Sequence, residues 1–156
     1  MSQGDKSGAV YFYHMTRTPL EATLRVLLEK SLAAGWKVLV RGTAAARLEW
    51  LDQKLWLDSA FLPHGMAGGP HDAAQPVLLT TGTDAPNQAD ALIAIDGAPV
   101  AAQEVAGFSR VMILFDGNDP QALDTARGQW KSLTQAGCHA LYWSEESGAW
   151  QKKAES

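Results

Sequence analysis

The sequence predicts an α/β domain whose mostly parallel sheet is covered by helices on both faces. Short apolar runs without polar alternation, such as PVLLTT, ALIAID and VMILF, are typical of strands that are buried on both faces. Amphipathic segments with leucines at three- and four-residue spacing separate these runs. The length of 156 residues, 46% of them hydrophobic, is sufficient for one domain with its own core.

The first third of the chain is predicted to form a strand, a helix, a strand and a helix, in that order. Residues 9–15 are rich in aromatic side chains, which favour a strand. In residues 18–21 (TPLE), a threonine N-cap, a first-turn proline and a capping-box glutamate begin the first helix, which ends at Gly35. A short apolar strand over 36–41 follows, and residues 42–43 begin the second helix.

The rest of the chain begins with an irregular segment, residues 58–75, in which prolines and glycines replace regular patterning. Loops of more than about 12 to 15 residues inside a domain are usually functional or disordered. Three strands, a helix capped by Asp119, a last strand and a short edge segment are predicted next, over 76–81, 91–96, 111–115, 120–136, 138–143 and 148–152. We expect residues 9–154 to form a single domain and residues 1–8 to be a flexible leader.

Cysteine usage and hydropathy restrict the compartment. The single cysteine, Cys138, cannot form an internal disulfide, and a buried thiol is favoured over a nucleophile because free cysteine is among the most buried residue types. The N-terminal residues lack the apolar run of a signal peptide, and no apolar run approaches the ~18 residues that a membrane helix needs. We therefore expect a cytoplasmic protein without a membrane partner.

Charge is distributed unevenly along the chain. The formal net charge is −4, which argues against a protein that holds nucleic acid by bulk electrostatics. Residues 1–57 carry eight Lys and Arg against five acids, whereas residues 58–156 carry five against twelve. One surface is therefore expected to be locally basic, and its natural partner is an acidic peptide.

The sequence contains no motif for a cofactor or a catalytic nucleophile. The first strand is followed by TRTP rather than by a glycine-rich dinucleotide turn, and neither G-x-x-x-x-G-K-[ST] nor G-x-S-x-G occurs. The histidines at 14, 64, 71 and 139 lack metal-ligand spacing. Asp96 and Asp116 each precede a glycine at a strand end, which is typical of turns. They also leave an alternative function, a small nucleotide- or metal-dependent enzyme that uses both carboxylates.

Tryptophans are the more informative candidates for binding. Six are present, and Trp50, Trp56, Trp130 and Trp150 lie outside the central strands. For each of these four, burial in the core is favoured over a role as an anchor for a partner. Trp56 and Phe61 nevertheless bracket the start of the irregular segment, where an anchor would be accessible.

One stripe of the last predicted helix combines apolar and basic side chains. Leu123, Arg127 and Trp130 follow one another at spacings of four and three, and Lys131 lies one turn from Arg127. An indole beside a cation makes a small pocket for an apolar side chain that bears a carboxylate. The alternative is an ordinary helix in which Trp130 packs on the sheet and Arg127 is solvated.

Several segments, taken in order, resemble the chi subunit family of bacterial DNA polymerase III. They are the aromatic first strand with T-x-x-P-L-E, the pair L-D-x-x-L-W and F-L-P-H-G at 51–56 and 61–65, and later QPVLLT, ADALIAIDGA, FSRVMILFDGNDPQALDTARGQWKSLTQAG and LYWSEESGAWQKKA. The pair is the most specific part, and the resemblance covers roughly residues 9–154. It implies a three-layer, Rossmann-like α/β fold without nucleotide chemistry, catalytic residues, metal or cofactor.

The resemblance also implies two partners. Members of this family are accessory subunits of the clamp-loader complex. They bind the acidic, phenylalanine-terminated C-terminal tail of single-stranded DNA-binding protein, and they bind the psi subunit, which tethers chi to the clamp loader. By position, the tail-peptide pocket falls on Arg127, Trp130 and Lys131, while Leu123 stands where some relatives carry a lysine.

The psi-binding surface implied by the resemblance maps to Trp56, Phe61 and Pro63. The favoured function is thus a non-enzymatic adaptor that contacts nucleic acid only indirectly, through single-stranded DNA-binding protein. Two alternatives stay open. One is the enzyme that uses Asp96 and Asp116. The other is direct binding of single-stranded nucleic acid by stacked aromatic residues, which the negative net charge of the chain disfavours.

Overall fold

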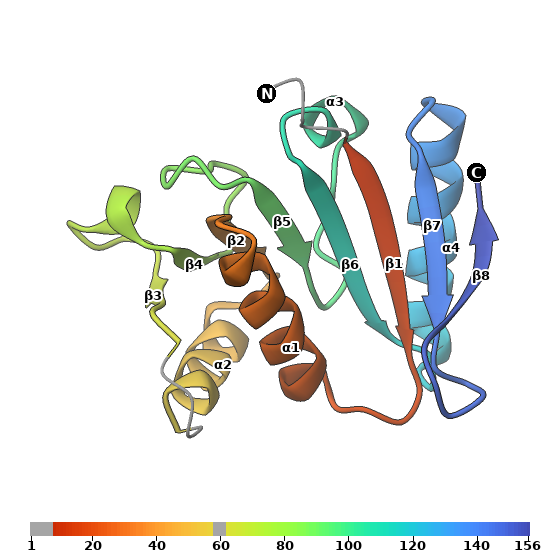
Figure 1. Cartoon of the computed structure of the whole chain (residues 1–156), viewed down its shortest axis with the longest axis horizontal. Helices are drawn as coiled ribbons and strands as arrows, with labels where there is room; N and C mark the ends of the chain where they lie inside the picture. Colours follow the sequence, from red (N-terminus) through yellow and green to blue (C-terminus); the bar gives the residue numbers. More distant parts are fainter. Residues whose placement is uncertain (1–7, 58–61) are drawn as a thin grey trace.

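Eight strands form one sheet in the computed structural model, which describes residues 8–57 and 62–156 (Figure 1). The strand order is β3-β4-β2-β5-β6-β1-β7-β8, and every neighbouring pair is parallel except the antiparallel pair β7–β8. The prediction of a three-layer α/β fold with a mostly parallel sheet is confirmed. The predicted leader, residues 1–8, lies outside the described residues except for Gly8.

The elements follow the predicted order, with boundaries that differ by a few residues. The strands are β1 Ala9–Met15, β2 Val38–Arg41, β3 Gly65–Met66, β4 Val77–Thr80, β5 Ala91–Ala94, β6 Arg110–Asp116, β7 Ala140–Ser144 and β8 Gln151–Glu155. The helices are α1 Leu20–Ala33, α2 Ala45–Leu57, α3 Ala102–Val105 and α4 Pro120–Gln135, with a 3-10 turn at Asp72–Ala74. The short β3, the 3-10 turn and α3 were not predicted, because segments of two to four residues carry no periodicity that a sequence pattern can detect.

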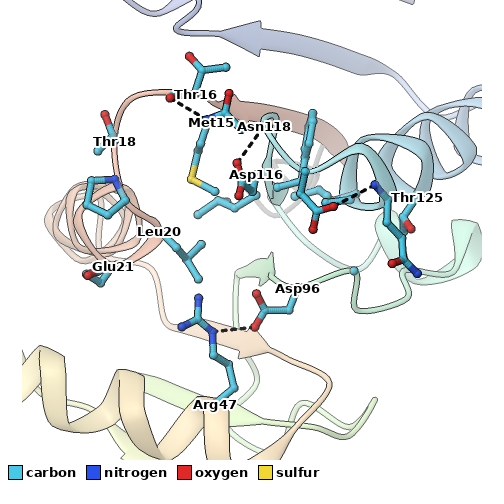
Figure 2. Close-up of a pocket in the computed structure, with 18 of the residues that line it drawn as sticks. Met15, Thr16, Thr18, Leu20, Glu21, Arg47, Asp96, Asp116, Asn118 and Thr125 are labelled. Atoms are coloured by element: carbon cyan, nitrogen blue, oxygen red, sulfur yellow. Dashed lines mark hydrogen bonds and ion pairs between the residues drawn. The ribbon is translucent and has the colours of Figure 1, made fainter.

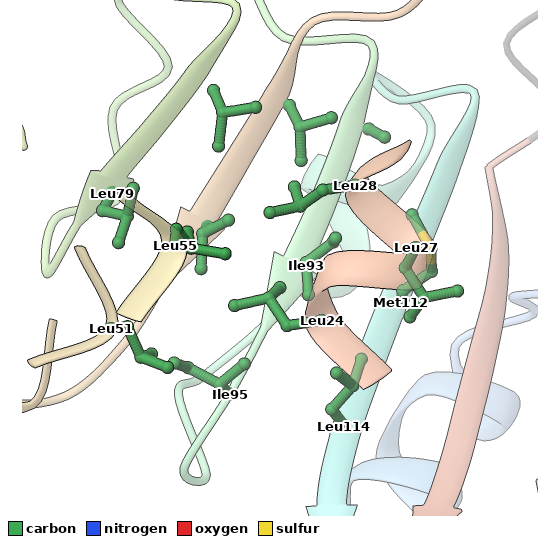
Figure 3. Close-up of a cluster of buried hydrophobic side chains, with 14 of the residues drawn as sticks. Leu24, Leu27, Leu28, Leu51, Leu55, Leu79, Ile93, Ile95, Met112 and Leu114 are labelled. Atoms are coloured by element: carbon green, nitrogen blue, oxygen red, sulfur yellow. The ribbon is translucent and has the colours of Figure 1, made fainter. Parts of the chain in front are cut away.

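Helices α1 and α2 pack on one face of the sheet, and α3 and α4 pack on the other. Figure 3 shows α1 contributing Leu24 and Leu28, and α2 contributing Leu51, to a cluster centred on β5 Ile93. All four side chains are completely buried. Burying one such side chain stabilises the fold by about 1.5 to 3 kcal/mol, so this cluster is a main source of stability.

The other end of the sheet has a helix on one face only. Figure 1 shows α4 behind β7, while none of the helices in the described part of the chain lies in front of β1 and β7. We call this opposite face of β1, β7 and β8 the open face. Val10 and Phe12 point toward α4 and are completely buried, whereas Tyr11, Tyr13 and Trp143 lie half-buried on the open face.

The prediction that Thr18 caps α1 was wrong. The residue before the helix is Pro19, and it makes no side-chain capping bond. The Thr18 hydroxyl instead donates to Glu145 Oε1 at 2.6 Å, and Glu145 Oε2 accepts the backbone N–H groups of residues 16–18 at 2.8 to 3.0 Å. A carboxylate from the end of β7 therefore organises the β1–α1 loop, because it satisfies more donors there than a threonine hydroxyl can.

Candidate functional site

Helix α4 carries the candidate tail-peptide pocket. Asp119 begins the helix, because its Oδ1 accepts the N–H of Gln121 at 3.0 Å, and Pro120 occupies the first helical position. Gly137 ends the helix with φ of 91°, a conformation that a glycine adopts without strain. Both ends were predicted from the sequence, so the rotational position of the stripe on α4 is well determined.

Trp130 forms the apolar wall of this pocket. Its ring lies edge to face with Phe12 of β1 at 5.4 Å and with Tyr142 of β7 at 5.9 Å between centroids. These contacts leave the indole half-buried, with the rest of the ring accessible. Trp130 is therefore both part of the packing against the sheet and available to a ligand, which combines the two predicted alternatives.

Arg127 supplies the cation next to this wall. Its side chain is 70% exposed, and its Nη1 lies 3.9 Å from Asp124 Oδ1, too far for a hydrogen bond. The pKa of the Tyr142 hydroxyl is raised by burial and by Glu146, while Arg127 lowers it, which places the guanidinium within electrostatic range of Tyr142. Leu123 lies half-buried one turn before Arg127, and Lys131 is exposed one turn after it. All four residues that the sequence suggested lie on α4, with Leu123 and Trp130 half-buried and Arg127 and Lys131 exposed.

Tyr142 lies against Trp130 and links it to His14, and neither residue was singled out at the sequence level. The Tyr142 hydroxyl and His14 Nδ1 are hydrogen-bonded at 2.8 Å, and the His14 ring packs on Phe115 with centroids 5.1 Å apart. A Cβ on Gly117 would overlap the His14 ring, so only glycine leaves room for it. The available signal was the alternation of side chains along β1 and β7, but the pattern does not reveal that these two strands are neighbours.

The second candidate surface lies at the end of α2. Trp56 is 49% exposed and Leu57 is 80% exposed, and the Trp56 ring stacks on the His64 imidazole with centroids 4.1 Å apart. His64 is buried, and its Nε2 lies 3.1 Å from Asp52 Oδ1. Pro63 is half-buried beside it, whereas Phe61 lies outside the described residues. We call Trp56, Leu57 and Pro63 the loop surface.

The prediction that tryptophans outside the central strands belong to the core was wrong for three of four. Trp50 and Trp150 are each 37% exposed, and Trp56 is more exposed still. Trp50 lies between the cations of Arg47 and Lys54, at 4.8 and 5.3 Å from its ring centre. Such cation–π contacts with long, flexible side chains let a helix carry an indole at its surface.

The thiol of Cys138 is half-buried and packs against the α4-side core.

Asp96 and Asp116 line one crevice of about 710 Å³ at the carboxyl ends of the strands, as Figure 2 shows. The crevice opens where β1 leads to α1 on one face and β6 leads to α4 on the other, the usual ligand position in such sheets. Both carboxylates already have partners: Asp96 Oδ2 accepts from Arg47 Nε at 3.1 Å, and Asp116 Oδ1 accepts the N–H of Asn118 at 2.9 Å.

Asp96 and Asp116 are thus each held by a hydrogen bond from a neighbouring residue. Within residues 8–57 and 62–156, no three His, Cys, Asp or Glu side chains group as metal ligands would. None of the helices in the described part of the chain is long and apolar enough to cross a membrane.

The fold is that of an α/β domain, and exposed aromatic and basic side chains lie on its surface. The chain belongs to the family of the DNA polymerase III chi subunit, HolC, whose model matches residues 8–140. It is 32% identical over 104 residues to "Probable DNA polymerase III subunit chi" of Rickettsia prowazekii (strain Madrid E), an alignment that covers 62% of each chain. The chi subunit is a non-catalytic accessory subunit of the polymerase, which confirms the predicted family and the prediction of a non-enzyme.

Proposed function

We propose that this protein links the clamp-loader complex of DNA polymerase III to single-stranded DNA-binding protein through the acidic C-terminal tail of that protein. Such a role places it in the cytoplasm, at the replication fork. The observation that carries the proposal is the exposed Arg127 guanidinium beside the half-buried Trp130 ring. A tail that ends in phenylalanine brings a ring and a carboxylate on one residue, and these two groups need an apolar wall and a cation at short range.

In this proposal the terminal ring packs between Trp130 and Leu123, and the terminal carboxylate binds Arg127. A charge-assisted, bidentate contact of this kind is stronger than a bond between neutral groups. Arg127 is suited to it because its nearest acid, Asp124, is itself 80% exposed and 3.9 Å away, so the guanidinium gives up little when it turns to a ligand. Lys131 attracts the aspartates upstream in the tail, and salt screens that attraction.

Isothermal calorimetry with a synthetic acidic peptide that ends in phenylalanine tests the tail pocket. Arg127→Ala is expected to weaken binding about tenfold or more, as the loss of one partner of an interfacial charge pair does. Arg47→Ala is the matched control, since Arg47 is also a partly exposed arginine paired with an aspartate, but on α2. Unchanged affinity in Arg127→Ala, or equal losses in both variants, would place the pocket elsewhere.

The loop surface is proposed as the contact with the psi subunit or an equivalent clamp-loader subunit. An exposed indole next to an exposed leucine is typical of an interface anchor, and stacking on His64 holds the Trp56 ring in one position before the partner arrives. Phe61 was predicted as part of this surface and stays a prediction.

Co-purification of the variant chain with its clamp-loader partner tests the loop surface. Trp56→Ala is expected to weaken the complex by about 1 to 2 kcal/mol and to leave the melting temperature almost unchanged. Trp50→Ala, which removes an exposed indole from the same helix, should leave the complex intact. A collapse of the melting temperature in Trp56→Ala would instead make Trp56 a structural residue.

A further inference from the structure

On the open face, five side chains touch one another in a continuous row. The Arg110 guanidinium lies 4.2 Å over the ring centre of Tyr11 and 5.5 Å over that of Trp36. Tyr11 and Tyr13 are stacked with centroids 6.4 Å apart, and Trp150 meets the Tyr13 ring edge to face at 5.6 Å. We call these five residues the aromatic row; it crosses from the start of β2, over β6 and β1, to the segment just before β8.

The row is anchored but not buried. Trp36, Tyr11 and Tyr13 pack partly against the α1-side core, which fixes their positions, and all three remain half-buried. Trp150 at the end of the row is 37% exposed. Trp143 pairs in register with Tyr13 and adds a further half-buried ring on the same face. Of the rings in the row, Trp150 has the largest exposed fraction, and its contact with Tyr13 holds it in place for a ligand that stacks on it.

Basic side chains lie at both ends of the row. Arg110 is at one end, and at the other Lys152 pairs in register with Trp143, with Lys153 beside it in β8. Arg17 reaches the same end, because its Nη2 donates to the carbonyl of Glu146 in the β7–β8 turn at 3.2 Å. Glu155 is the acid of β8, and it bonds Lys152 at 2.8 Å. Around the row, four basic side chains therefore stand against three acids of the β7–β8 hairpin, Glu145, Glu146 and Glu155, whereas the whole chain has a formal net charge of −4.

We propose that the aromatic row binds single-stranded nucleic acid directly, by stacking bases on its rings and pairing phosphates with its basic ends. An uncovered sheet face with aromatic side chains typically stacks about two or three bases. A duplex does not fit this chemistry, because the flat faces of its bases are already stacked on one another. An apolar protein partner would bury Arg110 and Lys152 without new counter-charges, at a large desolvation cost.

This contact is additional to the tail pocket and does not depend on it. The rings of the row lie on the opposite face of β1 from Phe12, the residue that Trp130 of the tail pocket contacts. Part of the row also lies beyond the segment that matches the family model, since that match ends at residue 140 and Trp150 follows it. A weak direct contact would hold a nucleic-acid strand that a partner protein presents. The strength of this contact depends on the charge near the row rather than on the net charge of the chain.

Fluorescence anisotropy with a labelled oligothymidylate of about 15 nucleotides and the full chain alone tests the proposal. We expect saturable binding at low salt whose logarithmic affinity falls with the logarithm of salt concentration, by about 0.7 per phosphate contacted. Trp150→Ala should weaken binding about tenfold. Lys152→Gln, which keeps the hairpin, should weaken it less and reduce the salt slope.

Trp50→Ala is the matched control, because Trp50 has the same exposed fraction as Trp150 and also lies beside cations, but on α2. Its affinity for the oligonucleotide should equal that of the unaltered chain. Three results would overturn the proposal: no saturable binding at low salt, equal losses in Trp50→Ala and Trp150→Ala, or a duplex that binds as well as the single strand. If an acidic peptide competes fully, the row is a peptide site and the proposal is wrong. The tail pocket is tested separately, by the effect of Arg127→Ala on binding of the tail peptide.

Discussion

The strands β4, β2 and β5 are covered on both faces, whereas β1, β7 and β8 are covered by a helix on one face only. In the covered half, the strand residues are small aliphatic side chains, and Val38, Leu39, Leu92 and Ile93 are completely buried. In the open half, the corresponding positions of β1 carry tyrosines, which bury much of their area against neighbours on the sheet and stay partly exposed. Partly buried aromatic side chains thus cover part of the open face, whereas helices α1 and α2 cover the same face of β4, β2 and β5.

The same difference separates stability from binding. Residues that fill the covered half are not accessible to a partner. They therefore raise the free energy of unfolding and do not take part in binding. The proposed tail pocket on α4 and the aromatic row both lie in the open half, where Trp130 and Trp150 pack against neighbouring rings and remain partly exposed. Preorganised aromatic groups of this kind are what binding surfaces require.

The largest expected effect is a core truncation in the covered half. Leu51→Ala is expected to lower the free energy of unfolding by about 3 kcal/mol, because the leucine is completely buried and its loss leaves a cavity. Urea unfolding followed by circular dichroism measures this. Leu57→Ala, the same change on the same helix at an 80% exposed position, should stay within about 0.5 kcal/mol. Similar effects in the two variants would contradict the assignment of α2's buried side.

A smaller effect is expected from the carboxylate that joins β7 to the β1–α1 loop. Burial alone would raise the pKa of Glu145, but hydrogen bonds from Thr18, Arg17 and Thr16 outweigh it and lower that pKa to about 2. Glu145→Gln is expected to cost about 2 kcal/mol at neutral pH, because the part-buried donors of residues 16–18 lose a charged acceptor.

The pH dependence of Glu145 gives a second measurement. The folded-state pKa is lowered, so this stabilisation is complete above the unfolded value near 4.5 and is lost as pH falls toward about 2. Glu145→Gln should therefore flatten the acid side of the stability curve between about pH 4.5 and 2. Glu146→Gln, at the exposed neighbouring position, should keep the original curve. An unchanged curve in Glu145→Gln would mean that the loop does not depend on this carboxylate.

The smallest of these effects is expected in the aromatic row. Burial raises the pKa of Tyr13 to about 12, although Arg110 opposes the shift. Tyr13→Phe should cost less than about 1 kcal/mol at neutral pH, since the ring contacts remain. Because the folded-state pKa is raised, stability is unaffected below about pH 10 and falls as pH rises to about 12, and the phenylalanine variant should lose less stability over that range. Absorbance at alkaline pH and urea unfolding measure the two quantities, and an ordinary phenol titration would contradict the burial.

Arg41 illustrates a residue that sequence reasoning could not place. It is the last residue of β2 and is 1% exposed, and its guanidinium makes a bidentate pair with Glu104 of α3 at 2.9 and 3.0 Å. Its Nε donates to the carbonyl of Gly82 at 3.0 Å as well. A charged residue at a strand end is normally expected in solvent. The partners that make its burial tolerable come from segments about 40 to 60 positions away, and no local pattern indicates them.

What the sequence by itself determined are the properties that depend on neighbours along the chain. Leucine spacing predicted α1 and α2; unbroken apolar runs predicted the parallel strands; and Asp119 with Pro120 predicted the start of α4. The stripe of Leu123, Arg127 and Trp130 also followed from helical periodicity alone, since residues three and four apart share a helix face. Together with the resemblance to the chi family, these patterns were sufficient for the fold class and for one candidate pocket.

Only the tertiary structure decided which distant segments meet. That β1 lies between β6 and β7 brings Tyr142 to Trp130, and it also brings Glu145 to the loop that Thr18 was predicted to cap. Exposure was decided in the same way, since whether an indole such as Trp150 is core or surface depends on which element covers it. Strand order and coverage result from packing contacts between residues far apart in sequence, and their free energies leave no periodic pattern along the chain.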